Sequence, residues 1–326
     1  MASEEHYLSP VADLTYRNYD GPLGSVKARW LAIALYQLKR SIKNRFLWVM
    51  AVGSGWYYFM MMIIFFFLEQ VVGQGGEAGQ RQFKEFLARI NWRDQFLLGF
   101  SYSQLIYFIL AWMLGAGAIA NDNRSNALLV YLSKPCSKFD YVFGKWMGVF
   151  MPLFGLQMLA TIFFWLYGGL SFNSYGFMSQ AGVVILQMIP VHLMSAALLA
   201  SVVIGISSLF NQGRVAGSTF AGVYLITNFF TQFVVMTILS QLRDGGSRLA
   251  NVKPGLFTMY YCSLDGIQIG LAKILLGTDG SPAFGINSRL PNIPIPSTFL
   301  MVAAWLVICL IGIGIAWKKV QAVEVV

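Results

Sequence analysis

The sequence contains few charged residues and few of the side chains that hold metals or form disulfides. Only 11% of its 326 residues are charged, whereas 57% are hydrophobic. An average soluble domain has about 25% charged residues, so this composition excludes an ordinary water-soluble protein. The three cysteines, Cys136, Cys262 and Cys309, are too few and too scattered to indicate a disulfide framework or a metal cluster. Of the two histidines, His6 lies in polar sequence, and His192 alone cannot form a paired-histidine haem site.

A nucleotide-binding loop is also missing. Such a loop has two glycines at a fixed spacing followed by Lys and Ser or Thr, because its backbone amides enclose phosphate groups. Here the Gly-Lys pair at 144–145 is followed by Trp146, and Phe139 stands where the first glycine belongs. Gly53-Ser54-Gly55 offers a serine, but small residues in apolar segments more often serve helix packing than catalysis. We therefore predict that the chain is not an enzyme and that it binds no cofactor or metal of its own.

Long apolar runs are the main feature that is present. A hydrocarbon core about 30 Å thick needs about 20 apolar residues per helix, and several charge-free runs reach that length. The sequence predicts an all-α polytopic membrane protein with six transmembrane helices. The spans are expected at about 46–68, 96–120, 146–169, 181–208, 215–240 and 297–317. Because these runs hold almost no ionisable side chains, a pump that moves charge through the bilayer by itself is not indicated.

The distribution of basic residues predicts the orientation. The net charge is +9, and with the N-terminus inside, most Lys and Arg residues near short loops fall on the cytoplasmic side. We expect a multi-pass protein of the inner (cytoplasmic) membrane with both termini cytoplasmic, so the charge needs no nucleic-acid partner. Residues 1–45 are predicted to form a cytoplasmic tail and an interfacial helix, and residues 46–326 a single transmembrane domain. The polar N-terminal residues do not resemble a cleaved signal peptide.

An amphipathic helix is predicted just before the first span, within residues 26–45. Its apolar side chains recur at helical spacing, at Leu31, Leu35, Leu38 and Ile42. Basic residues on the other faces suit anionic lipid, so we expect this helix to lie in the inner membrane interface. A solvent-exposed cytoplasmic helix is the alternative.

Short external helices are predicted before the sixth span, within the external segment 241–296. Apolar residues recur at helical spacing over 260–274. Asp265 and Lys273 argue against a full span, so we expect a helix that lies on the outer leaflet or dips into it. Pro- and Gly-containing loops flank it.

A polar segment between the second and third predicted spans carries the most information about function. Asp122-Asn123-Arg124 opens it, Ala127, Leu128 and Leu132 supply an apolar face, and Pro135 ends it. A short helix with an apolar face can dock in a cleft of a soluble partner and transmit its movement to both spans. An ordinary cytoplasmic loop is the alternative, but such a loop rarely needs an amphipathic turn.

This segment resembles the ABC-2 type transporter permease family. The similar stretches are Asp122-Asn-Arg124, Asn126-Ala-Leu-Leu129, Lys134-Pro-Cys-Ser-Lys138 and Tyr141-Val-Phe-Gly-Lys145. Asp122 stands where Glu is common in the family, and Asn126 where Gly is usual. The resemblance extends to the basic interfacial helix, the six spans and the external helices.

The resemblance implies a permease subunit of an ATP-binding cassette exporter. Two copies of a cytoplasmic ABC ATPase would bind ATP and Mg²⁺, and a second copy of the permease, or a related one, would complete the assembly in membrane lipid. A cytoplasmic coupling helix would sit in a cleft of the ATPase. The coupling residues implied are Asp122, Asn123, Arg124, Ala127, Leu128, Tyr131, Leu132 and Pro135. An amphiphilic or hydrophobic substrate is expected, and a structural membrane anchor that transports nothing is the alternative.

Polar side chains within the predicted spans are candidates for a substrate pathway, because they are costly in lipid unless they meet water or a partner. The candidates are Gln104, Gln157, His192, Asn228 and Gln232. Hydrogen bonding between helices is the alternative role for each. Asn228 and Gln232 are the stronger candidates, because a spacing of four places both on one helix face.

Overall fold

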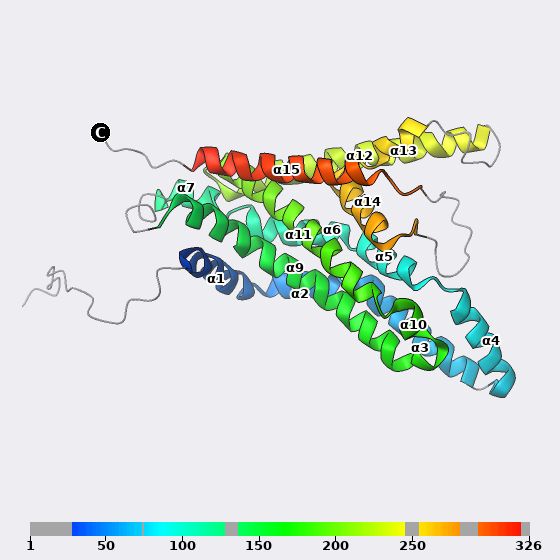
Figure 1. The fold of residues 1–326 in the computed structure, drawn as a ribbon. Helices are drawn as coiled ribbons and strands as arrows, with labels where there is room; N and C mark the ends of the chain where they lie inside the picture. The colour runs from blue at the N-terminus through cyan, green and yellow to red at the C-terminus, as the bar shows by residue number, and fades with distance from the viewer. Residues whose placement is uncertain (1–27, 74, 128–135, 245–253, 281–292, 321–326) are drawn as a thin grey trace, which may run out of the picture.

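The computed structural model describes residues 28–73, 75–127, 136–244, 254–280 and 293–320, and these ranges contain helices and no strand (Figure 1). The elements are α1 (Arg29–Ile42), α2 (Arg45–Gly53), α3 (Trp56–Gly73), α4 (Gly76–Arg89), α5 (Trp92–Tyr102), α6 (Gln104–Gly115), α7 (Ala120–Arg124), α9 (Lys138–Ser171), the 3₁₀ helix η2 (Asn173–Tyr175), α10 (Phe177–Ala181), α11 (Val184–Ser208), α12 (Gly213–Asp244), α13 (Pro254–Tyr260), α14 (Leu264–Leu276) and α15 (Thr298–Lys319). The described part of the chain is therefore all-α, as the sequence predicts.

Five stretches of helix are long and apolar enough to cross a membrane: α6 with α7, α9, α11, most of α12, and α15. Together, α2 and α3 would make a sixth span, although they are bent by 51° at a short break. The chain is thus a multi-pass membrane protein with five or six spans. Figure 1 shows α1, α7 and the last turn of α15 at one end of the bundle, and α4, α10 and α13 at the other.

The first two predicted spans are each interrupted, which the sequence does not predict. The first breaks between α2 and α3 at Ser54 and Gly55, and the second breaks at Ser103, between α5 and α6. The hydroxyl of Ser103 donates to the carbonyl of Ser54 at 2.6 Å, so the two breaks lie together. Side-chain hydroxyls that bond to backbone carbonyls are a known cause of bends in membrane helices.

α11 lies at the centre of the bundle. It packs against α6, α9, α12, α14 and α15, and its inward residues from Ala196 to Ala200 are buried. α14 packs against α5, α11, α12 and α15, and most of its apolar side chains are buried. A helix is therefore present at the place predicted, 260–274, and it is inserted between other helices; its location at the outer leaflet stays a prediction. An apolar stripe has the same spacing whether lipid or protein covers it, which is why the sequence did not separate the two.

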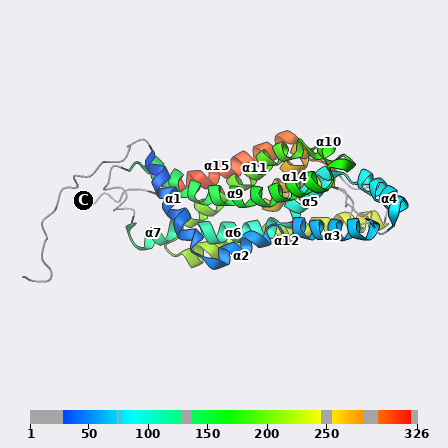
Figure 2. The same cartoon turned by 90° about the horizontal axis from the view of Figure 1, so that it is seen from below.

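α1 lies alongside the first half of α9, as Figure 2 shows. Glycine makes this approach possible, because a Cβ atom on Gly144 would stand 2.7 Å from the carbonyl oxygen of Trp30. In the apolar stripe predicted on α1, Leu35 and Ile42 are 43% and 42% exposed, whereas Leu31 and Leu38 are half-buried. A helix is thus present at the predicted place, and its location in the membrane interface stays a prediction.

Candidate functional site

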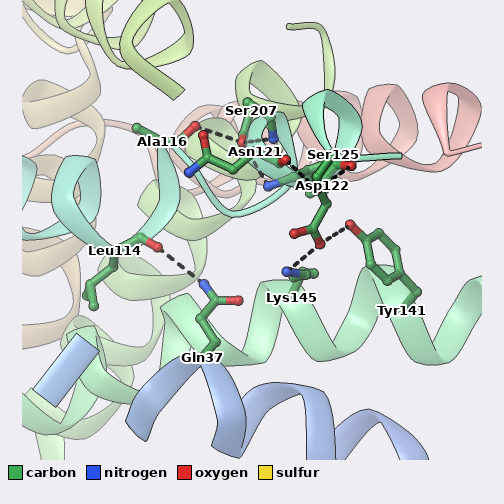
Figure 3. Close-up of polar contacts among 11 residues, drawn as sticks. Gln37, Leu114, Ala116, Asn121, Asp122, Ser125, Tyr141, Lys145 and Ser207 are labelled. Carbon is green, nitrogen blue, oxygen red and sulfur yellow. Dashed lines mark hydrogen bonds and ion pairs between the residues drawn. The ribbon is translucent and has the colours of Figure 1, made fainter. Parts of the chain in front are cut away.

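A polar cluster fixes α7 to the ends of three other helices. We call it the connector anchor, and it consists of Asn121, Asp122, Asn123, Tyr141, Lys145 and Ser207. It lies at the end of the bundle that carries α1, where the chain leaves α7 and returns through α9 (Figure 3). Its members come from α7, α9 and α11.

The centre of the connector anchor is the carboxylate of Asp122. Its Oδ2 accepts a hydrogen bond from the hydroxyl of Tyr141 at 2.8 Å and lies 2.7 Å from Nζ of Lys145 (Figure 3). The side chains of Lys145 and Asp122 are only 9% and 17% exposed. A charge-assisted bond that is largely shielded from water is stronger than a surface pair and costly to break on one side. α7 and the first turns of α9 are therefore held together.

Ser207 fixes the turn that precedes α7. Its Oγ accepts hydrogen bonds from the backbone N–H groups of Ile119 and Ala120, each at 3.1 Å, and donates to the carbonyl of Ala116 at 2.9 Å. One hydroxyl thus satisfies three backbone groups that the end of α6 leaves without helical partners. This joins the end of α6 to the end of α11.

The two asparagines of α7 bond to the turn between α11 and α12. Oδ1 of Asn121 accepts from the N–H of Gly213 at 3.3 Å, and Nδ2 of Asn123 donates to the carbonyl of Phe210 at 3.1 Å. α7 is therefore connected to α6, α9, α11 and α12. A force applied to the segment that follows α7 would reach all of these helices.

The predicted coupling residues divide into inward and outward groups. Asp122 and Asn123 point into the bundle and bond within the chain, which the sequence did not indicate. Arg124 is exposed and Ala127 half-buried. The other four, Leu128, Tyr131, Leu132 and Pro135, lie outside the described residues. The resemblance includes both Asp122 and Lys145, but the sequence did not predict the ion pair between them.

Three of the predicted pathway residues are buried among helices. Nε2 of His192 lies 2.8 Å from Oγ1 of Thr161, and Nε2 of Gln157 donates to Oγ of Ser195 at 3.2 Å, so both side chains join α9 to α11. Gln104 is buried as well, and its Nε2 lies 3.4 Å from the carbonyl of Phe100 on the same span. Contacts of this kind are what the alternative role involves, and a pathway role for the three residues stays a prediction.

The other two pathway residues, Asn228 and Gln232, line a cavity of about 590 Å³. We call it the α5–α12 cavity, because α5 and α12 form two of its walls and α13 and α14 the others. Asp265 and Lys273 of α14 line it too. The sequence offered these two charges inside an apolar helical pattern, and that pattern is the signal by which they could have been found.

Burial shifts the protonation of the charged groups in the cavity. Burial raises the pKa of Asp265 to about 6, although hydrogen bonding to Tyr224 and Asn228 opposes the shift. Burial lowers the pKa of Lys273 to about 8, opposed by the charges of Asp279 and Asp94. Within the described ranges, no group of three or more His, Cys, Asp or Glu side chains is placed to hold a metal ion.

No curated protein matches the chain. The family model described as ABC-2 family transporter protein matches residues 31–316, an interval that runs from α1 to the last turns of α15 and contains both the connector anchor and the α5–α12 cavity. The chain therefore belongs to the ABC-2 transporter family and is a membrane subunit of an ABC transporter.

Proposed function

We propose that this chain is the permease of an ATP-driven exporter and is moved by a separate cytoplasmic ATPase. Two copies of the ATPase and two permeases, identical or related, would form the complex in the inner membrane. Family membership supports an ATPase partner, and the sequence has no phosphate-binding loop of its own. The observation that carries the proposal is that Asp122 accepts a hydrogen bond from Tyr141 and pairs with Lys145, directly before the predicted coupling segment.

The mechanism follows from the connections of α7. When ATP binding closes the two ATPases, a coupling segment held in their clefts would move with them. Asp122 passes that displacement to α9, and Asn121, Asn123 and Ser207 pass it to α11 and α12. Several spans would then move as a unit, which is what alternating access requires.

α1 provides a second point at which the ATPase could act on the bundle. Nε2 of Gln37 donates to the carbonyl of Leu114 at 3.2 Å, which joins α1 to α6, and α1 packs along α9 (Figure 3). With both termini cytoplasmic, α1 would lie in the inner interface beside the connector anchor. Both α1 and the connector anchor would then face the ATPase.

Asp122→Asn tests the coupling. It keeps the size of the side chain and the contact with Tyr141, but it removes the charge that pairs with Lys145. We expect the ATPase to copurify with this variant. The increase in ATP hydrolysis that the permease produces in host lipids should fall about tenfold, within the usual range of coupling between sites.

Glu77→Gln is the matched control, because it removes an exposed acidic partner of Arg81, 3.8 Å away, and should leave hydrolysis unchanged. Leu128→Arg should separate the ATPase from the membrane subunit, because it places a charge on the predicted docking face. If Asp122→Asn retains full stimulation, the proposed route of coupling is wrong. If no ATPase copurifies with the natural chain, the chain is an anchor of another kind.

A further inference from the structure

The α5–α12 cavity has the size and walls of a site for a small organic ligand. Its volume of about 590 Å³ falls within the range of ligand pockets. α14 packs against both α5 and α12, and the cavity lies between these three helices and α13. The apolar part of the lining consists of Leu97, Leu98, Val235, Met236, Ile238 and Ile269. Such walls suit a hydrophobic body.

One carboxylate in this lining is incompletely bonded. Oδ2 of Asp265 accepts from the hydroxyl of Tyr224 at 2.7 Å. Oδ1 of Asp265 is buried and has no hydrogen-bond partner among the described residues. A buried carboxylate oxygen without a donor is costly, and native structures nearly always supply one. Because Oδ1 is buried, a ligand in the cavity would act on this carboxylate through its charge and not through a bond to Oδ1.

Among the described residues that line the cavity, the one amine already has a partner. Nζ of Lys273 donates to the carbonyl of Ile293 at 2.7 Å and lies 5.9 Å from the ring centre of Tyr261. Asp279 also lines the cavity, so its lining in the described part of the chain holds two carboxyl groups and one amine. The charge balance favours a ligand that is positive.

We propose that the α5–α12 cavity binds an amphiphilic organic cation, with its positive charge beside Asp265 and an apolar body against the walls from α5 and α12. This proposal names the substrate class of the proposed exporter. Only the transport of the ligand depends on that function. Binding itself needs no ATPase. The positive charge of the ligand would pair with the carboxylate of Asp265, which lines the cavity.

Protonation of Asp265 adds a measurable consequence. The groups near its carboxylate are Tyr224 and Asn228 on α12, Tyr260 on α13 and Lys273 further along α14. Because the pKa of Asp265 is about 6, the carboxylate is charged above that pH and neutral below it. Between pH 7.5 and pH 5 the charged fraction falls about tenfold, so the affinity for a permanent cation should fall by a similar factor.

Binding is measured by fluorescence anisotropy with the purified chain in phosphatidylcholine nanodiscs. Rhodamine 6G is the probe, because it is a permanent cation with N–H donors on an apolar ring system, and fluorescein is its anionic counterpart. We expect saturable binding of rhodamine 6G at pH 7.5, about tenfold weaker binding at pH 5, and no binding of fluorescein. Asp265→Asn should weaken binding about tenfold and remove the pH dependence.

Two further variants complete the test. Ser101→Phe places a bulky ring in the cavity from the α5 wall and should abolish binding, whereas the exposed Glu77→Gln should not change it. Should Asp265→Asn fail to fold, the pH series on the natural chain and Ser101→Phe decide the question. Equal binding of both dyes, or natural affinity and pH dependence in Asp265→Asn, overturns the proposal.

Failure of the proposed ligand site can be distinguished from failure of the proposed exporter function. Cation binding by a chain with which no ATPase copurifies would support this ligand site and contradict the exporter. Normal coupling without rhodamine 6G binding would support the exporter and contradict this ligand class.

Discussion

Ser207 shows how much of the fold near the connector depends on one hydroxyl. Its side chain is fully buried and bonds three backbone groups at the end of α6 and the start of α7. The adjacent Ser208 is also buried, but its hydroxyl donates only to the carbonyl of Gly205 on its own helix. The two serines are therefore a natural pair for comparison.

Ser207→Ala should lower the free energy of unfolding by about 1–3 kcal/mol, because it leaves the buried N–H groups of Ile119 and Ala120 without an acceptor. Ser208→Ala serves as the control and should have a much smaller effect. Thermal unfolding of the purified protein in detergent measures both. Equal losses for the two variants would contradict the assigned role of Ser207.

At the residue scale, the sequence indicated several polar residues of the candidate sites but not the residues to which they bond. Asp122 and Lys145 were both recognisable in the motif, yet their bond depends on how α9 returns past α7, which no local pattern encodes. Asn228 and Gln232 share a face, as predicted, and line a cavity. Asp265 was passed over because its burial arises from helices distant in sequence.

At the scale of helices, α11 and α15 approach each other closely. A Cβ atom added to Gly312 would lie 2.3 Å from the carbonyl oxygen of Ser201, and one added to Gly205 would lie 2.7 Å from the carbonyl oxygen of Gly312. Small residues allow membrane helices to approach closely, since no hydrophobic force drives them together in lipid. Gly314, on the same helix, has nothing within 4 Å of its added Cβ.

Gly312→Ala should therefore separate α11 from α15, lower the thermal stability in detergent and reduce the yield of monodisperse protein. The matched change Gly314→Ala should be neutral or slightly stabilising, because Ala favours the helix by about 1 kcal/mol over Gly. Size-exclusion chromatography and thermal unfolding distinguish the two. A Gly312→Ala protein as stable as the natural one would show that the crossing tolerates a wider spacing.

The positions of the long helices could be predicted, because a charge-free run of 20 residues has few other uses. The spans expected at 181–208 and 297–317 correspond to α11, Val184–Ser208, and α15, Thr298–Lys319. The breaks at Ser54 and Ser103 could not be predicted, because Ser and Gly often occur within unbroken membrane helices and the bend depends on a neighbouring span. The coupling helix predicted after α7 lies mostly outside the described residues and stays a prediction.

For the whole molecule, the natural cysteines report the orientation. Cys262 is exposed in the turn between α13 and α14, Cys136 is half-buried just before α9, and Cys309 is buried in α15. In the predicted topology the first faces outward and the second faces the cytoplasm. Burial raises the pKa of the Cys136 thiol, with Asp140 adding to the shift and Arg29 opposing it, so its labelling needs mildly alkaline buffer.

A membrane-impermeant maleimide should label Cys262 in right-side-out vesicles. It should label Cys136 only after the membrane is opened, and Cys309 only in denaturant. Single Cys→Ser variants identify each labelled residue by mass spectrometry. Labelling of Cys136 in sealed right-side-out vesicles would reverse the orientation and remove the coupling segment from the reach of any cytoplasmic ATPase.

The paired breaks at Ser54 and Ser103 determine how far the end of α3 moves when the bend angle changes slightly. The hydrogen bond between them gives two neighbouring spans one common pivot. α3 extends 18 residues beyond it, a lever arm of about 27 Å at 1.5 Å per residue. A change of about 10° in the bend would swing its far tip by about 5 Å, roughly the pitch of one helical turn. A small tilt at the pivot would thus be magnified at the opposite membrane face.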